Sequence, residues 1–269
     1  MEVKAIRSGN GVGDNLYLQA IVKHLIKTTP YKYRVHTRYP SLFVQFGGRV
    51  EIKPFQRENI DIVAHYTNRK GRPGTTQFQD MCENAGIKEP VSLTLDWKVG
   101  NRGLIERIRG HANGKKLLLV QLPRETFGRN DGYGRELMPD YSVMDRIVGH
   151  LVSKHNYFAV QIGCGKVEYR LKNISYDLAE KTQLEEVFDL SSAADLFIGQ
   201  TSFFIPLSEC FDKKCIIVWS SKGLKSPTAF LSSVTPQKIL HKKTCKAVTD
   251  DSNFEKIKSE VDEFLNEQA

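Results

Sequence analysis

Short apolar runs and helix-period segments alternate along the first half of the chain. Four runs have the length and composition of buried strands: residues 3–6, 33–36, 50–52 and 60–64. Between the first two, residues 15–28 place Leu16, Ala20 and Leu25 among polar residues at helical spacing. Pro, Gly and polar clusters separate these segments. This rhythm predicts strand–helix–strand units in a mainly parallel sheet.

The same rhythm starts again in the second half. Four further runs are predicted strands: residues 117–120, 157–162, 196–198 and 215–219. Helical periodicity follows at residues 141–154, 203–211 and 253–267. The stretch 111–116, after a predicted helix at 103–110, is small and polar. We therefore place a boundary between an N-terminal domain, 1–113, and a C-terminal domain, 114–269, whose last helix is free to pack back on the first.

Two successive α/β halves predict two Rossmann-like domains that face each other across a cleft. Open sheets of this kind bind ligands outside the carboxyl ends of their strands. Functional residues are therefore expected in the loops that follow strands.

Composition and charge narrow the class of protein. A chain of 269 residues is long enough for two domains, and it has no run of about 18 apolar residues and no secretory signal at its start. We expect a soluble, cytoplasmic protein. Its five scattered cysteines favour neither a disulfide scaffold nor structural zinc. The net charge of +8 favours an anionic partner, whether nucleotide phosphates, nucleic acid or a peripherally contacted membrane surface.

The first loop is rich in glycine. It reads Ser-Gly-Asn-Gly-Val-Gly-Asp from Ser8 to Asp14 and opens the first predicted helix, where backbone N–H groups can face an anion. Its glycine spacing is not the dinucleotide fingerprint, and the P-loop lysine is missing. Asp14 either caps the helix, a contribution of ~1 kcal/mol, or has a functional role.

Residues 11–20, which read Gly-Val-Gly-Asp-Asn-Leu-Tyr-Leu-Gln-Ala, resemble the opening motif of the ADP-heptose:lipopolysaccharide heptosyltransferase family, whose fold is GT-B. The resemblance implies that Asp14, next to Gly13, is a general base. Residues 33–40 keep the order of second strand and short polar turn found in that family. The match covers residues 3–45 and 116–245.

In the second half, residues 117–124 and the basic loop that follows are similar to the strand and phosphate-binding loop of the family. The resemblance places Arg124, Arg129 and Arg135 at the donor diphosphate, where fixed guanidinium groups neutralise developing charge. The alternative is an exposed loop with solvated arginines.

Residues 191–207 resemble the most recognisable stretch of these transferases, an Ala-Asp pair, an apolar strand, Gly-x-Asp-[Ser/Thr]-Gly and a helix. Gln200 stands where an aspartate is common and Phe203 replaces the glycine. Thr201 and Ser202 can still bind phosphate at a helix start, although the turn can also be a simple connector and cap. Because of these two differences from the family motif, the sequence defines the identity of the nucleotide-sugar donor less well than the type of reaction.

Weaker candidates complete the predicted donor site. Gly163 follows a strand at the place where such folds pass the nucleotide, and Glu168 or Glu209 can accept ribose hydroxyls or be solvated surface groups. The sequence shows no histidine cluster, so we expect no metal and no cofactor, with the nucleotide sugar as substrate.

These features together predict an inverting, metal-independent glycosyltransferase. Asp14 would deprotonate an acceptor hydroxyl on a lipopolysaccharide-type glycan, a hydroxymethylated DNA base, or a protein or small molecule. The alternative from another class is a non-catalytic α/β module that binds nucleotides or nucleic acid. A nucleotide-sugar epimerase is a weaker rival, because its dinucleotide glycines and Tyr-x-x-x-Lys pair are not both present. The sequence leaves the oligomeric state open.

Overall fold

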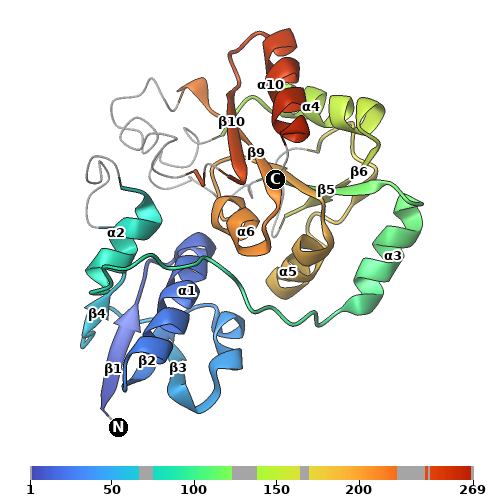
Figure 1. Ribbon diagram of the computed structural model, residues 1–269. Coiled ribbons are helices and arrows are strands. Elements are labelled where there is room, and N and C mark those ends of the chain that lie inside the picture. Colours follow the sequence, from blue (N-terminus) through green and yellow to red (C-terminus); the bar gives the residue numbers. More distant parts are fainter. Residues whose placement is uncertain are drawn as a thin grey trace. The chain divides into compact units, whose positions relative to one another are not determined.

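A computed structural model of the chain describes residues 2–66, 75–122, 138–163, 170–222, 240–241 and 243–267. The described chain forms two compact units, the first ending at Trp97 and the second starting at Lys98 (Figure 1). Each contains one parallel sheet with helices. The predicted α/β fold with two parallel sheets is confirmed.

The first unit has a four-stranded sheet in the order β3-β2-β1-β4. Its strands are β1 (Val3–Arg7), β2 (Lys32–Thr37), β3 (Val50–Pro54) and β4 (Ile62–Val63). Helix α1 (Val12–Thr28) joins β1 to β2, and two 3₁₀ turns, η1 (Pro40–Leu42) and η2 (Val44–Arg49), precede β3. Helix α2 (Gln77–Asn84) lies beside α1, because the rings of Tyr17 and Phe78 stack at 5.1 Å.

The two faces of this first sheet differ. Successive side chains of a strand point to opposite faces, and Tyr33 and Val35 of β2 are buried on the α1 side, where the Tyr33 hydroxyl lies 2.9 Å from that of Thr29. On the other face, Arg34 pairs in register with Glu51, and His36 with Lys53. One face of the sheet is therefore apolar and packed, and the other carries charged side chains.

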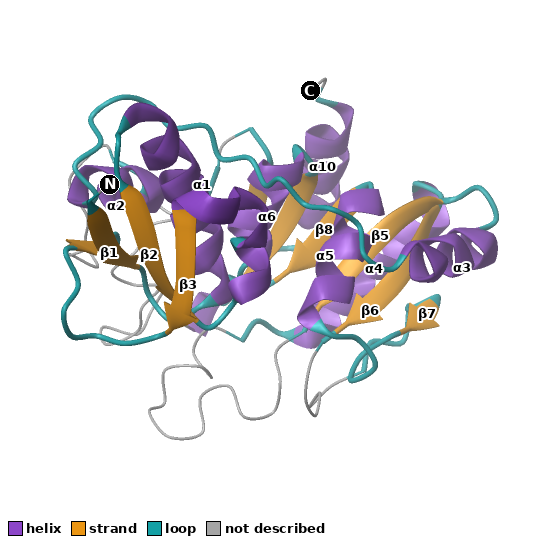
Figure 2. Ribbon diagram, turned by 90° about the horizontal axis from the view of Figure 1, so that it is seen from below, coloured by secondary structure: helices purple, strands orange, loops and turns teal. Residues whose placement is uncertain are grey.

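The second unit has a six-stranded sheet in the order β10-β9-β8-β5-β6-β7. Its strands are β5 (Lys116–Gln121), β6 (Tyr157–Ile162), β7 (Tyr176–Asp177), β8 (Leu196–Gly199), β9 (Lys214–Trp219) and β10 (Cys245–Thr249). Its helices are α3 (Arg102–Ala112), α4 (Tyr141–Lys154), α5 (Leu184–Ala193), α6 (Phe204–Phe211) and α10 (Phe254–Asn266). Helices lie on both sides of this sheet (Figure 2), and Leu117 to Val120 of β5 are fully buried, as a parallel strand covered on both faces should be.

The division between the units lies at Trp97/Lys98, earlier in the chain than the boundary placed after residue 113 from the sequence. Helix α3 packs on α5 and β5, so it belongs to the second unit. The buried carboxylate of Asp189 on α5 accepts hydrogen bonds from the backbone N–H groups of Gly100 (3.0 Å) and Asn101 (2.7 Å), which fixes the segment before α3. The last helix, α10, packs on α4 and β10 of the same unit.

Across the described ranges, no helix combines the length and apolar character needed to cross a membrane.

Candidate functional site

Each sheet has one switch point, a place where successive strands along the chain stop being added on one side of a strand and are added on its other side. In the first unit β1 lies between β2 and β4, and in the second β5 lies between β6 and β8. The loops that follow the two adjacent strands at such a point run in opposite directions and open a crevice at the carboxyl ends of these strands, where α/β proteins bind ligands. The strongest sequence candidates, Asp14 and Ser202, lie at these two points.

The first loop is fixed by Asn15, which is almost completely buried. Its side-chain amide donates to the carbonyl oxygens of Gly9 (3.1 Å) and Gly11 (2.8 Å). Its Oδ1 accepts from the hydroxyl of Thr37 at the end of β2 (2.8 Å). Because both the amide nitrogen and the oxygen of the Asn15 side chain are hydrogen-bonded, they hold the backbone of the loop in a defined conformation.

Asp14 lies in the first turn of α1, after Gly13, and its Oδ2 accepts a hydrogen bond from the backbone N–H of Gly11 at 3.4 Å. The capping role considered from the sequence is therefore present. Burial raises the pKa of the Asp14 carboxyl above its ordinary value of 3.8, while the charge of His65 and the Gly11 hydrogen bond act in the opposite direction. A carboxylate whose pKa is raised is a stronger base near neutral pH.

His65 was not singled out by the sequence, although it follows directly after the predicted strand 60–64. In the structure it follows β4 and lies next to the Asp14 carboxylate across Gly9, since a β-carbon on Gly9 would be 2.0 Å from Asp14 Oδ2 and 3.0 Å from His65 Cδ2. Its Nδ1 is 2.8 Å from the carbonyl oxygen of Tyr66, and the Asn84 amide donates to the His65 carbonyl at 2.6 Å. The first switch point thus holds an acid and a histidine in fixed positions.

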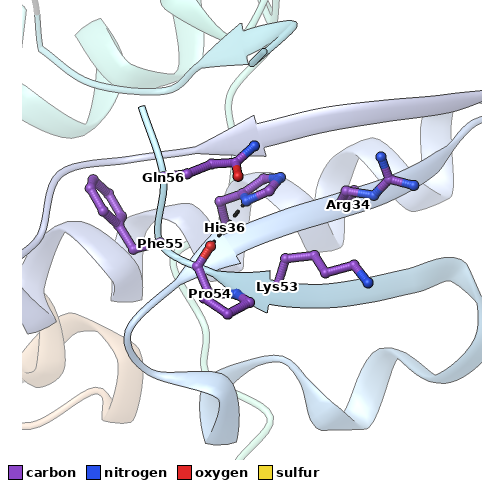
Figure 3. Close-up of a pocket in the computed structure, with 6 residues that line it drawn as sticks. All are labelled: Arg34, His36, Lys53, Pro54, Phe55 and Gln56. Carbon is purple, nitrogen blue, oxygen red and sulfur yellow. Dashed lines mark hydrogen bonds between the residues drawn. The ribbon is translucent and has the colours of Figure 1, made fainter. Parts of the chain in front are cut away.

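A pocket of about 460 Å³ lies on the charged face of the first sheet (Figure 3). It is lined by Arg34, His36, Lys53, Pro54, Phe55 and Gln56. His36 Nδ1 is 3.1 Å from the Pro54 carbonyl, and its buried Nε2 has no hydrogen-bond partner among the described residues. The guanidinium groups of Arg7 and Arg38 lie over the ring of Phe55, 5.8 and 5.9 Å from its centroid.

The charge of this pocket is positive. Glu51 is paired with both Arg34 and Lys53 at 2.8 Å, and hydrogen bonds from Lys53 and Arg34 lower the pKa of Glu51 to about 2. One carboxylate thus faces two cations in the pocket and the two arginines at Phe55. The arrangement is suited to an anionic group, because four cationic side chains lie near one carboxylate, and guanidinium and ammonium groups bind phosphate or carboxylate.

At the second switch point, the hydroxyl of Ser202 donates to the side-chain oxygen of Gln121 at the end of β5. Ser202 Oγ also accepts from the backbone N–H of Phe204 at the start of α6 (3.2 Å). A side chain on Gly199 would meet the backbone oxygen of Gln121 at 3.4 Å, so the glycine permits close approach of β8 to β5.

Three buried polar atoms at the carboxyl ends of β8 and β9 have no hydrogen-bond partner among the residues that the structure describes. They are Oε1 of Gln200, Oγ1 of Thr201 and Nε1 of Trp219. Unsatisfied buried polar groups are uncommon in folded proteins and mark strain, water or a ligand. Two of them belong to the predicted donor site, and Trp219 is one that sequence reasoning missed.

The remaining candidates are only partly brought together. Gly163 directly follows β6 at the same sheet edge, and its carbonyl accepts from the Glu180 N–H at 2.7 Å. Glu209 lies toward the other end of α6 and accepts from the hydroxyl of Thr244, just before β10, so it faces the amino edge of the sheet. The other four candidates lie outside the described residues: Arg124, Arg129, Arg135 and Glu168.

Comparison with solved structures identifies the fold. ADP-heptose lipopolysaccharide heptosyltransferase II of E. coli is 12% identical over 98% of both chains, with a TM-score of 0.64. A family 9 glycosyltransferase of Veillonella parvula is 10% identical over 100% of this chain and 99% of that one, with a TM-score of 0.66. E. coli heptosyltransferase WaaC, solved with ADP, is 11% identical over 98% of both chains, with a TM-score of 0.58.

No protein-family model and no curated protein matches the sequence. The similarity is therefore one of fold, and the fold is that of the heptosyltransferases and other GT-B glycosyltransferases, as the motifs predicted.

Proposed function

We propose that the protein is a glycosyltransferase that moves a sugar from a nucleotide-sugar donor to an acceptor hydroxyl with inversion. The observation that carries the proposal is Asp14, a carboxylate with a raised pKa held at the first switch point by Gly11 and flanked by His65. The fold shared with glycosyltransferases supports it.

Asp14 is the proposed general base. It takes the proton from the acceptor hydroxyl as that oxygen attacks the anomeric carbon, and the bond to the leaving diphosphate breaks on the opposite side of the sugar. Proton transfer to a positioned carboxylate contributes typically ~10²–10⁴-fold to a rate. The neighbouring charge of His65 opposes the effect of burial on the pKa of Asp14, so the pair sets the pH at which the base is available.

The donor binds at the second switch point in this proposal. The unpaired Thr201 hydroxyl, just before α6, can donate to a phosphate, which the backbone N–H groups of a helix start also attract. The unpaired side-chain oxygen of Gln200 is an acceptor and would take a hydroxyl group of the donor. The predicted guanidinium groups of Arg124, Arg129 and Arg135 would neutralise the departing diphosphate, a role that requires no metal.

The acceptor is anionic in this proposal. Arg34, Lys53 and the arginines at Phe55 outnumber the nearby carboxylate of Glu51. Phosphates of a lipopolysaccharide-type glycan and of DNA with hydroxymethylated bases both fit such a pocket. Binding of DNA would weaken steeply as salt rises.

The test combines donor binding with turnover. In a thermal-shift screen of nucleotide diphosphates and nucleotide sugars, one nucleotide class should raise the melting temperature of the protein. That donor is then incubated with hydroxymethylcytosine-containing DNA or with phosphorylated glycans, and products are identified by mass spectrometry. If the donor binds but is neither transferred nor hydrolysed, the non-catalytic module is favoured. If no nucleotide changes the melting temperature, the proposed donor site is contradicted.

A further inference from the structure

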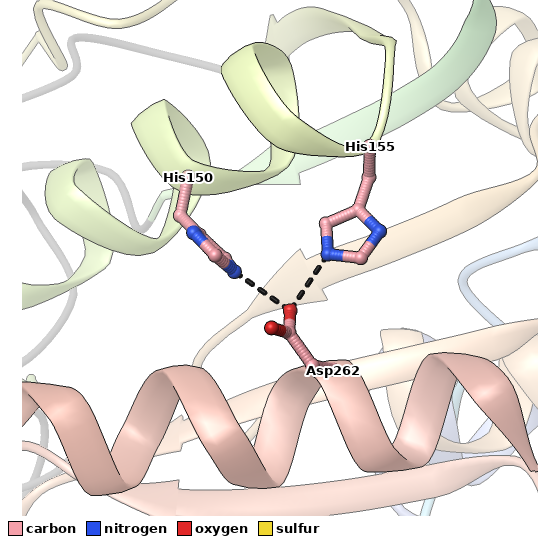
Figure 4. Close-up of side chains that lie close together, drawn as sticks. All are labelled: His150, His155 and Asp262. Atoms are coloured by element: carbon pink, nitrogen blue, oxygen red, sulfur yellow. Dashed lines mark hydrogen bonds and ion pairs between the residues drawn. The ribbon is translucent and has the colours of Figure 1, made fainter.

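Three polar side chains of the second unit converge at a place unrelated to the candidate site. The Nε2 atoms of His150 and His155 each lie 2.7 Å from the same carboxylate oxygen, Oδ1 of Asp262 (Figure 4). His150 lies on α4, His155 directly follows that helix, and Asp262 lies on α10. Helices that are distant in sequence thus contribute three potential ligand atoms to one point.

The second oxygen of the carboxylate has its own partner. Lys154 Nζ lies 2.6 Å from Asp262 Oδ2, which leaves Oδ1 to the two histidines. Burial opposes ionisation of Asp262, but hydrogen bonds from Lys154, His150 and His155 hold its pKa well below the usual range.

We propose that His150, His155 and Asp262 form a binding site for a divalent transition-metal ion of the zinc class. Two imidazole nitrogens and one carboxylate oxygen are a ligand set that Zn²⁺ commonly takes, with water in the fourth position. The three ligand atoms lie within 4.8 Å of one another. The side chains are 12%, 19% and 22% exposed, so a cation has access to them.

The ligand atoms must move to accommodate the ion. Ligand bonds of about 2.0–2.1 Å in a tetrahedron separate the ligand atoms by roughly 3.3 Å, compared here with 2.7 Å between each nitrogen and the oxygen and no more than 4.8 Å between any two of the three atoms. Asp262 would bind through Oδ1 alone, while Oδ2 keeps its contact with Lys154. The ammonium group thus orients the carboxylate rather than competing for the same oxygen.

The position of the site indicates a structural role. Helix α4 ends at Lys154 and β6 begins at Tyr157, so His155 lies at the amino edge of the sheet. Thr201 and Ser202 lie at the carboxyl edge, after β8. A metal at His155 would join α4 to α10 and leave the proposed sugar transfer to the opposite edge.

The test measures metal binding to untagged, metal-free protein. Titration with Zn²⁺ in competition with a chromophoric chelator should give one equivalent for the wild type. His150→Gln, His155→Gln and Asp262→Asn should each weaken that binding at least tenfold. Lys154→Met and His24→Gln are the controls, and both variants should still bind one equivalent of Zn²⁺. His24 is a matched control because it also pairs with a carboxylate, that of Glu89 at 2.8 Å, but lies outside the proposed site.

Spectroscopy and melting complete the experiment without relying on a single variant. Co²⁺ in the wild type should give visible bands without the near-ultraviolet absorption of thiolate ligands, and Zn²⁺ should raise its melting temperature. No bound equivalent, full retention of affinity in folded His150→Gln, or a thiolate spectrum would each overturn the proposal. Glycosyl transfer is not a readout here, so failure of the proposed function leaves this test unaffected.

Discussion

The backbone of Gly9 lies directly against the carboxylate of Asp14: a β-carbon on Gly9 would be 2.0 Å from Asp14 Oδ2. No real β-carbon approaches an oxygen so closely, so the carboxylate can occupy this position only because residue 9 has no side chain.

Gly9→Ala should therefore displace Asp14 and lower kcat by about 100-fold, because misplacement of a reacting group by about 1 Å has this order of effect. Gly11→Ala is the matched control, since its β-carbon would be 3.4 Å from the same oxygen. Steady-state kinetics and nucleotide thermal shifts measure both. Wild-type kcat in Gly9→Ala would contradict the assigned position of the base.

Asp14→Asn should lower turnover by ~10²–10⁴-fold and raise the melting temperature at pH 7. Burial raises the folded-state pKa of Asp14 above its unfolded value of 3.8. The cost of burying the charge therefore appears as pH rises through the folded-state pKa and disappears below the unfolded one. Melting curves between pH 3 and pH 8 should show the two proteins converging at the acid end, and a variant that is less stable at pH 7 would argue against a buried charge.

His65→Gln should move the acid limb of the kcat/KM profile to higher pH. In the proposed mechanism, turnover needs ionised Asp14 and is lost as pH falls through its pKa, which the charge of His65 lowers. Removing that charge leaves burial less opposed, so the base becomes protonated at a higher pH. If the acid limb of the profile, measured with saturating donor, does not move, then His65 does not influence the pKa of the proposed base.

Thr201→Val should weaken donor binding by about 10- to 100-fold, the range expected for a lost hydrogen bond to a charged group. The free protein should be no less stable, because the buried Thr201 hydroxyl has no partner among the described residues. Ser202→Ala is the contrasting variant. It removes contacts with Gln121 and Phe204 and should lower the melting temperature. Equal donor affinity in Thr201→Val and wild type would remove Thr201 from the site.

Asp189→Ala should destabilise the second unit by about 2–4 kcal/mol, since it leaves two backbone donors without their charged acceptor. Those donors are the N–H groups of Gly100 and Asn101, and Asp189 itself is only 2% exposed. Urea unfolding followed by circular dichroism measures the change. Asp189→Asn should lose less, because an amide oxygen still accepts one of the two bonds.

Local pattern was enough to predict much of the fold. Apolar runs marked β1, β2, β5, β6, β8 and β9, and the resemblance located Asp14 and Ser202 after strands. Strand β10 was missed because its sequence, Cys-Lys-Ala-Val-Thr, is short and mixes apolar with polar residues. Helix α5 was missed because its last turn is also the beginning of the motif at residues 191–207.

Contacts between distant segments could not be predicted in the same way. His65 lies near Asp14 because β4 pairs with β1 in the sheet. The strand order β3-β2-β1-β4 cannot be predicted from the spacing of residues within any one segment. His150 and Asp262 are 112 positions apart in the chain and meet only after α4 and α10 pack. The chemistry of a residue was visible in the sequence, whereas its neighbours depended on tertiary structure.

The charged face of the first sheet also has an evolutionary consequence. Arg34, Glu51 and Lys53 are each between 43% and 47% exposed on strands whose opposite face forms the core. Exchanges at such positions usually change stability by no more than about 0.5 kcal/mol. Related chains can thus change what this face binds and keep the same scaffold. Because this face binds the acceptor in the proposed reaction, we expect the acceptor to diverge first.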